Sequence, residues 1–464
     1  MFKFLKILPL LTFIIIITIS ISCSKKVVNT QTKNSKDSTV VVSKADLKKE
    51  KNSENDDYYQ KNRLRYNDYV YVDNIKTILL HKEGSELSMP ILELNSDDKL
   101  KISFDDFDND VKYYKYTIIH CDAYWKPSDL QQSEYISGFT EDYIEDYEFS
   151  LNTMQSFIHY KLIFPTENLK LFKSGNYLLK VYLGESDNVC FTKRFMIYES
   201  KVTVDAKINR TNDVSERNYN QKINFSIKKG AYNIVDPSTN LKIIITQNRR
   251  WDNAIKGLQP LMVKDEILDY NFYDSKNVFS GGNEFRNFDF RSLKYTINNV
   301  WKISYDSSFN QVYLKSDINH HYDIYYSEQD INGKRLIKTY DGNNDATESD
   351  YAFVHFFLPY KTPLVYGNLY LMGTLTDWQF NKQGLLKYNY QKHGYETTIY
   401  LKQGYYNYQY VFLENGKTIG DESFIEGKHF ETENDYTIYV YYRESGTLYD
   451  KLIAVKLVNT VKSN

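Results

Sequence analysis

The acidic run Asp105–Asp110 comes closer to a metal-binding spacing than any other segment of this sequence. Within it, every second residue from Asp106 onward is an aspartate, which is how a calcium-binding EF-hand loop begins. The pattern then fails, because Val111 stands where that loop needs glycine and Thr117 where it needs a bidentate glutamate. Aspartate and asparagine suit turns, so we predict a charged turn between two strands.

Two other groups could in principle support catalysis. Carboxylates beside aromatic residues are used by glycosidases, but nothing here fixes their separation, so we predict a solvated acidic loop. His120 and Cys121 would form a nucleophile pair only if they shared a face, and neighbours on a strand point to opposite faces. We therefore predict no enzyme activity and no cofactor. The acidic loop residues are Glu134, Glu141, Asp142, Glu145 and Asp146.

Arginine and tryptophan side chains suggest binding instead of catalysis. These residue types anchor protein interfaces, and here they recur beside acidic residues in Arg249–Asp252 and Asn283–Asp289. An internal arginine–carboxylate network around a long loop is an equally good interpretation of both motifs. The candidate partner-contact residues are Trp125, Arg250, Trp251, Arg286 and Trp378.

The elements that position these residues are predicted to be strands. The chain has 464 residues, 44 of them tyrosine and 26 phenylalanine, and both types favour pleated, half-buried surfaces. Short apolar runs are separated by turn signals, and no helix of about twelve residues or more is expected after the N-terminus. The net charge of -2 gives no basic excess, so nucleic acid is not an expected partner.

The N-terminus reads as a targeting signal followed by a tether. Residues 1–22 combine an early lysine pair with an apolar core, and Cys23 then precedes a polar run. This pattern resembles a bacterial lipoprotein signal with Cys23 as the lipidation site, although Ser20 stands where a large aliphatic residue is more usual. A plain secreted protein and an uncleaved anchor are the alternatives. Residues 23–66 are predicted to be a flexible tether.

The remaining chain is predicted to be all-β, with tandem immunoglobulin-like β-sandwich domains. We expect a first domain over 67–200, a second over 201–346 and a third over 347–464. Leu293–Ile303 is one of the expected strands of the second domain. Cys121 and Cys190 are expected to be buried free thiols, with a disulfide as the alternative.

The third domain resembles the glycogen-binding type of carbohydrate module. The resemblance lies in Gly367–Trp378 and Leu401–Tyr410, and it would make Trp378 the first sugar-stacking residue. Lys417 stands where the second stacking tryptophan of that family would be. We therefore expect the same fold with its sugar-binding role lost or changed, and glycan binding is not expected.

A longer resemblance extends from about Asn74 to the C-terminus. The chain resembles the type IX secretion system plug protein family of Bacteroidetes. The segments that carry the resemblance are Ser103–Asp106, Tyr116–Asp122, Trp125–Leu130, Glu134–Phe139, Gly175–Tyr182, Arg250–Ala254, Gly281–Arg286 and Thr376–Tyr442.

This resemblance implies a non-catalytic role. Plug proteins of this type associate with the giant outer-membrane β-barrel translocon and close its pore on the periplasmic side. The expected location is the periplasmic face of the outer membrane, held by lipid on Cys23, or the soluble periplasm without lipid. The alternative function is that of a glycan-binding outer-membrane lipoprotein.

Overall fold

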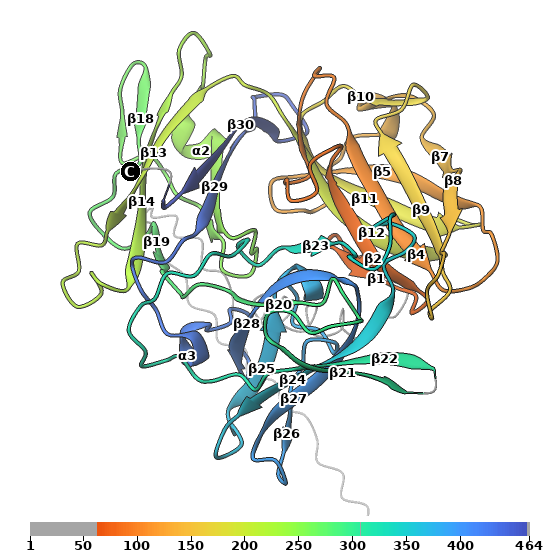
Figure 1. Cartoon of the computed structure of the whole chain (residues 1–464). Coiled ribbons are helices and arrows are strands. Elements are labelled where there is room, and N and C mark those ends of the chain that lie inside the picture. Colours follow the sequence, from red (N-terminus) through yellow and green to blue (C-terminus); the bar gives the residue numbers. More distant parts are fainter. Residues whose placement is uncertain (1–62, 307, 462–464) are drawn as a thin grey trace, which may run out of the picture. The chain divides into compact units, whose positions relative to one another are not determined.

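The computed structural model describes residues 63–306 and 308–461 (Figure 1). The predicted signal peptide, Cys23 and most of the predicted tether lie outside the described residues. The described residues all belong to one unit, Lys61–Asn464. Their secondary structure is almost entirely β, which confirms the predicted fold class. Within this part of the chain, no helix is long and apolar enough to cross a membrane.

The first sandwich packs two antiparallel sheets, plus one short parallel strand, around an aromatic core. Its buried core residues all fall between Ile75 and Ile197, and the Phe104 ring contacts the rings of Tyr160 at 5.2 Å and Phe191 at 5.0 Å. One sheet has the order β1 (Tyr69–Val70), β12 (Val189–Tyr198), β11 (Gly175–Leu183), β5 (Tyr114–Cys121) and β7 (Glu141–Ile144), with β3 (Ile91–Glu93) on β12. The other has the order β2 (Ile75–Lys82), β4 (Leu100–Asp106), β9 (Ile158–Phe164) and β8 (Asp146–Phe149).

The second sandwich draws strands from two distant parts of the chain. One sheet has the order β13 (Thr203–Arg210), β14 (Asn220–Lys228), β18 (Ile267–Asp269) and β17 (Met262–Val263), with β19 (Val278–Ser280) on β14. The other has the order β16 (Ile255–Lys256), β15 (Leu241–Gln247), β29 (Asp435–Tyr442) and β30 (Lys451–Asn459). Figure 1 shows β29 and β30, in blue, beside the green strands of this sandwich.

The third sandwich begins before the expected third domain. Its first sheet joins β28 (Gly404–Glu414) to β20 (Arg286–Asp289), β23 (Arg335–Ile337) and β25 (Gly367–Met372). Its second has the order β21 (Val300–Asp306), β22 (Phe309–Leu314), β24 (Tyr351–Pro359), β27 (Gly394–Lys402) and β26 (Lys387–Asn389). The third sandwich therefore includes β20, β21, β22 and β23, which precede the expected boundary between residues 346 and 347. The second sandwich includes β29 and β30, which follow that boundary.

One predicted strand is shorter than expected. The run Leu293–Ile303 becomes a strand only at Val300. The Asp341 carboxylate accepts hydrogen bonds from the Leu293 main chain at 2.7 Å and from the Ser292 hydroxyl at 2.9 Å, which holds the preceding residues in a turn. Cys121 and Cys190 are buried free thiols.

Candidate partner-binding surface

The start of the acidic run is used for buried ion pairs. Asp105 accepts from Lys402 Nζ at 2.6 Å and lies 2.6 Å from His159 Nδ1. Asp106 is paired with Lys112 at 2.9 Å. These contacts neutralise the two carboxylates within the fold. Among the residues that the structure describes, no group of three or more His, Cys, Asp or Glu side chains could hold a metal ion.

His120 and Cys121 do not form a reactive nucleophile pair. Both are buried on β5. Burial lowers the pKa of His120 to about 4 and raises the pKa of the Cys121 thiol to about 12. At neutral pH the thiol is therefore protonated, and the imidazole is too weak a base to activate it. The acidic loop carboxylates near Trp125 in the sequence lie at or near the surface of the first sandwich.

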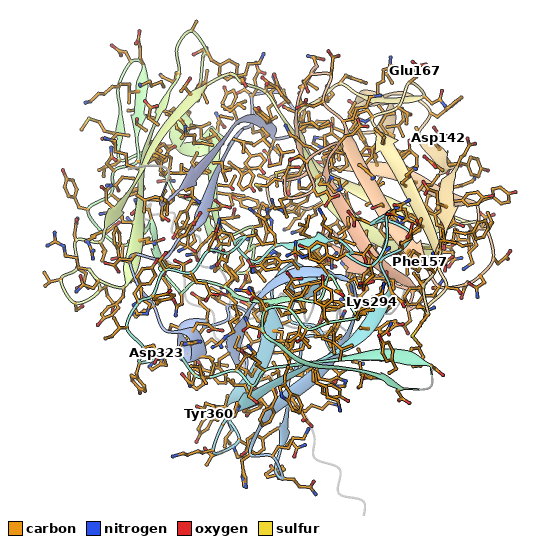
Figure 2. All side chains as sticks on the ribbon, in the orientation of Figure 1. Asp142, Phe157, Glu167, Lys294, Asp323 and Tyr360 are labelled. Atoms are coloured by element: carbon orange, nitrogen blue, oxygen red, sulfur yellow. The ribbon has the colours of Figure 1, made fainter. Side chains whose placement is uncertain are left out.

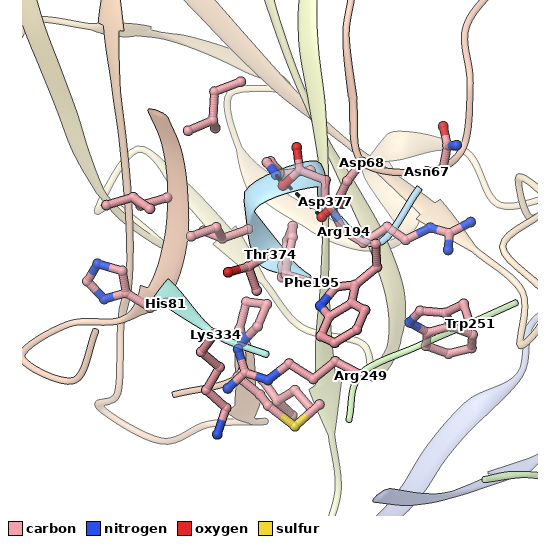
Figure 3. A pocket seen from close by; sticks show the side chains of 18 of the residues that line it. Asn67, Asp68, His81, Arg194, Phe195, Arg249, Trp251, Lys334, Thr374 and Asp377 are labelled. Atoms are coloured by element: carbon pink, nitrogen blue, oxygen red, sulfur yellow. Dashed lines mark hydrogen bonds and ion pairs between the residues drawn. The ribbon is translucent and has the colours of Figure 1, made fainter. Parts of the chain in front are cut away.

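Three of the five candidate contact residues line one cavity. Trp125, Trp251 and Trp378 form part of the wall of a cavity of about 440 Å³. The rings of Trp125 and Trp251 meet edge to face at 5.5 Å, and the Arg194 guanidinium lies 4.3 Å from the centre of the Trp125 ring. Figure 3 shows Trp251 and Arg194 at this wall. Trp125 is buried, whereas Trp251 and Trp378 are half-buried, so only the last two offer surface to a partner.

Trp378 has packing neighbours within the third sandwich. Its ring contacts Phe285 edge to face at 5.9 Å. It also covers Gly333, where a Cβ atom would come within 2.4 Å of the indole ring. Glycine is needed at position 333 both for this close approach and for its φ of +72°. This environment gives Trp378 a structural role.

The other two candidates, Arg250 and Arg286, belong to an internal arginine–carboxylate network. Arg250 pairs with Glu422 at 2.7 Å, and Arg286 pairs with Glu426 at 2.8 Å, at either end of the short helix α3 (Ser423–Glu426). Burial disfavours both charges, but the paired carboxylates outweigh it and raise the pKa of both guanidinium groups. This arrangement matches the second interpretation of the two arginine motifs.

Several exposed apolar side chains lie on the connection between β22 and β23, next to the arginine–carboxylate network. Residues 315–334 connect β22 to β23, and residues 323–330 belong to no strand or helix. Ile318 is 60% exposed, Tyr322 92%, Ile324 93% and Tyr326 78%. We call Ile318–Tyr326 the aromatic segment. Apolar side chains exposed this close together in sequence make the segment a candidate interaction site. Figure 2 places Asp323, near the middle of the segment, at the periphery close to α3.

The aromatic segment is firmly attached to the third sandwich at its first end. Arg286 Nη2 donates to the main-chain oxygen of Ile318 at 2.7 Å, and Arg286 Nη1 pairs with Asp317 at 3.2 Å. The Asp317 carboxylate also accepts from the hydroxyl groups of Tyr408, at 2.8 Å, and Tyr410, at 2.6 Å. Arg286 thus positions the exposed side chains and does not itself reach a partner.

The second end is held by two carboxyl groups with altered pKa values. Glu284 accepts from the Tyr325 hydroxyl at 2.5 Å, and Asp330 accepts from the Phe285 main chain at 2.5 Å. Burial raises the pKa of Glu284 to about 7 and that of Asp330 to about 6. The attachment at this end is therefore sensitive to pH near neutrality.

The sequence interpretation missed the aromatic segment. Its only signal is the alternation of apolar residues from Tyr322 to Tyr326, which is equally typical of a half-buried strand. Exposure depends on whether a second layer covers the segment. That depends on the tertiary arrangement of β20, β28 and α3, which no local pattern encodes.

A family model described as the first domain of the type 9 secretion system plug protein matches residues 75–199. These bounds enclose the core of the first sandwich. The chain is also similar to a hypothetical protein from Parabacteroides merdae ATCC 43184, whose crystal structure has 34% identity and a TM-score of 0.83. That similarity covers 86% of this chain and 100% of the other.

Two further solved structures are much more distant. The C-terminal domain of AspA from Streptococcus pyogenes has 10% identity and a TM-score of 0.14, over 83% of this chain and 99% of that one. The C-terminal domain of BspA from Streptococcus agalactiae has 8% identity and a TM-score of 0.15, over 82% and 98%. TM-scores this low do not indicate a shared fold. A search of curated proteins gives no match.

Proposed function

Because the chain belongs to the type IX secretion plug protein family, we propose that it is a non-catalytic plug that binds the system's outer-membrane barrel and closes its pore on the periplasmic side. A role associated with type IX secretion follows from the family itself. The barrel as partner, and the sealing of its pore, are the proposal. The observation that carries it is the aromatic segment, in which three side chains are more than three-quarters exposed.

The chemistry of the aromatic segment suits reversible protein contact. Tyrosine gives a large apolar ring with a polar tip, and it is enriched where protein interfaces carry most of their binding energy. The segment is already held by Arg286 and Glu284, so binding would order few additional residues. Prior ordering reduces the entropy lost on association and so strengthens binding.

The proposed anchor completes this arrangement. Lipid on Cys23 would keep the protein at the periplasmic face of the outer membrane, and the predicted tether would let the plug leave and re-enter the pore. A tether of this kind raises the effective concentration of the plug at its barrel, to about the millimolar range for a short flexible linker.

Site-specific photocrosslinking tests the proposed contact. A photoreactive amino acid at Tyr322 or Ile324, in cells that carry the secretion system, is expected to form adducts with the barrel. The same label at Tyr113 or Tyr273, which are 77% and 83% exposed elsewhere, provides the matched control. Equal adduct yields at all four positions, or no barrel adduct at Tyr322 and Ile324, would refute contact through the aromatic segment.

A further inference from the structure

The cavity beside the three tryptophans is rich in positive charge. Its wall includes side chains from all three sandwiches (Figure 3). Of the four acidic residues on the wall, Asp68 and Asp377 are paired with Lys193, Asp252 is paired with Arg250, and Glu86 is exposed. The five cationic residues on the wall are Lys193, Arg194, Arg249, Lys334 and Arg335.

Three of these cations hydrogen-bond only to main-chain carbonyls among the described residues. Arg194 Nε donates to Tyr66 at 2.7 Å, Arg249 Nη2 to Leu87 at 2.5 Å, and Arg335 Nη2 to Ile78 at 2.9 Å. Burial lowers the pKa of Arg194 and of Arg249 to about 10. Charges shielded from water in proteins are normally paired, so Arg194 and Arg249, which lack a carboxylate pair and are shielded, and the half-buried Arg335 beside them would suit an anionic ligand.

Two tryptophans of the same wall have buried indole nitrogens. The indole nitrogens of Trp125 and Trp378 are buried and have no hydrogen-bond partner within the described part of the chain. Trp125 itself is only 4% exposed. A buried donor without an acceptor costs free energy unless something accepts from it. Each nitrogen is covered by protein atoms, so neither N–H group contacts the cavity in this arrangement.

Like charges also approach one another there. Figure 3 shows the Arg249 side chain extending toward Lys334. The pKa of Lys334 is lowered by burial and then by the nearby Arg249 charge, although Lys334 is paired with Asp435 at 3.1 Å. An anion between these two cations would remove their mutual repulsion.

We propose that this cavity binds a small polyvalent oxyanion, through Arg249 and Lys334 first and through Arg194 and Arg335 around them. The volume lies within the range of about 300–1,000 Å³ that is typical of small-molecule sites. Arginine recognises carboxylate and phosphate oxygens with equal facility, so the shared ligand chemistry is a multiply charged oxygen anion. This inference is independent of the plug role.

The ligand would link the three sandwiches. Arg194 comes from β12 of the first, Arg249 follows β15 of the second, and Lys334 and Arg335 lie at β23 of the third. An anion held by all of them would therefore stabilise the packing of one sandwich against another. Binding to the folded state alone raises the thermal midpoint, and the rise continues with the logarithm of the ligand concentration above Kd.

Tryptophan fluorescence provides the measurement. Three of the four tryptophans line the cavity, so Trp301→Phe leaves only indoles at the site. The full-length chain with this substitution is titrated with citrate and, separately, with inorganic phosphate, against sodium chloride at equal ionic strength. The expected result is a saturable fluorescence change with a raised thermal midpoint. Response to citrate alone assigns a carboxylate ligand, and response to phosphate alone assigns a phosphate ligand.

Substitution of the cationic residues on the cavity wall provides a second test of anion binding. Arg249→Met and Lys334→Met should each weaken binding about tenfold or more, since each removes a charge-assisted contact. Lys294→Met is the control, because this side chain is 71% exposed on the third sandwich. No response beyond that to chloride would overturn the proposal, as would unchanged affinity in both variants. If Arg249→Met does not fold, anion binding is still tested by Lys334→Met and by titration of the Trp301→Phe chain with no further substitution.

Discussion

Asp105 is a residue at which the first and third sandwiches meet. Its carboxylate, on β4, accepts from Lys402 on β27 and from the Tyr351 hydroxyl on β24, both at 2.6 Å. Burial alone would raise the pKa of Asp105, but Lys402 and His159 outweigh it and hold that pKa below its usual value. The charge is therefore retained inside the protein by its partners.

Removing one partner tests this network. Lys402→Met leaves the Asp105 carboxylate buried with less compensation, which typically costs about 3–5 kcal/mol of unfolding free energy. Urea unfolding at pH 7 measures the loss. Lys392→Met removes an exposed pair with Glu396, and such pairs contribute about 0–1 kcal/mol. Equal effects of the two substitutions would show that the Asp105 network does not stabilise the fold.

Cys23 carries the prediction about the anchor. If lipid on Cys23 holds the protein at the membrane, Cys23→Ala should move it from the membrane fraction to the soluble periplasmic fraction. Immunoblotting of fractionated cells measures this, with a known lipoprotein and a known soluble protein as references. A Cys23→Ala protein that fractionates and plugs as the parent does would exclude the tethering proposal.

At this scale, sequence reasoning selected residues by type and by their neighbours in the sequence, and it could not predict all of their contacts in the fold. It identified the arginines at 250 and 286 from their acidic and aromatic neighbours in sequence. Asp252, a partner of Arg250, lies within the same motif, but Glu422 and Glu426, which complete the network, lie more than a hundred residues away. The acidic run was predicted to be a charged turn, but the ion pair of Asp105 with Lys402 could not be predicted, because Lys402 comes from a distant strand.

The aromatic segment is the element whose attachment should respond to pH. Glu284 and Asp330 have pKa values raised above their usual range, so the folded state holds their protons more tightly than the unfolded state does. Their contribution to stability is therefore full below about pH 4 and is lost as pH rises through about 6 to 7. His429, whose ring contacts Tyr325 at 5.6 Å, has a pKa lowered by burial and stays neutral from pH 7 upward.

Hydrogen exchange measures this dependence. Main-chain amides of residues 315–334 should be less protected at pH 8 than at pH 6, after correction for the intrinsic exchange rate. The double variant Glu284→Gln, Asp330→Asn should remove most of the difference, because neither side chain can then ionise. An undiminished difference in that variant would assign the effect to other groups.

Short apolar runs predicted an all-β chain, because apolar alternation reports which face of a strand is buried. They did not predict which strands pair. β15 pairs with β29 over Leu241–Gln247, although almost two hundred residues separate the two strands. Nothing local distinguishes this partner from a nearer strand, since both present apolar residues at the same spacing.

At the scale of the whole molecule, this long-range pairing determines which fragments of the chain should fold on their own. Residues 75–199 contain nearly the complete core of the first sandwich and should unfold cooperatively on their own. Residues 201–346 lack β29 and β30, and with them the core residues Tyr436, Ile438, Val440 and Ile453. We expect this fragment to show no cooperative thermal transition by circular dichroism. A cooperative transition would support the second domain boundaries expected from the sequence.

The proposed contact between the aromatic segment and the outer-membrane barrel would hold the plug in place. Its most direct test is co-purification of the barrel, in detergent, with the triple variant Tyr322→Ser, Ile324→Ser, Tyr326→Ser. The control variant is Tyr113→Ser, Val214→Ser, Tyr273→Ser, which removes equally exposed residues elsewhere. We predict at least about a tenfold loss of barrel with the first variant and none with the second, because interface hot spots each contribute about 2 kcal/mol or more. A first variant that keeps the parent's thermal midpoint and recovers as much barrel would contradict the claim.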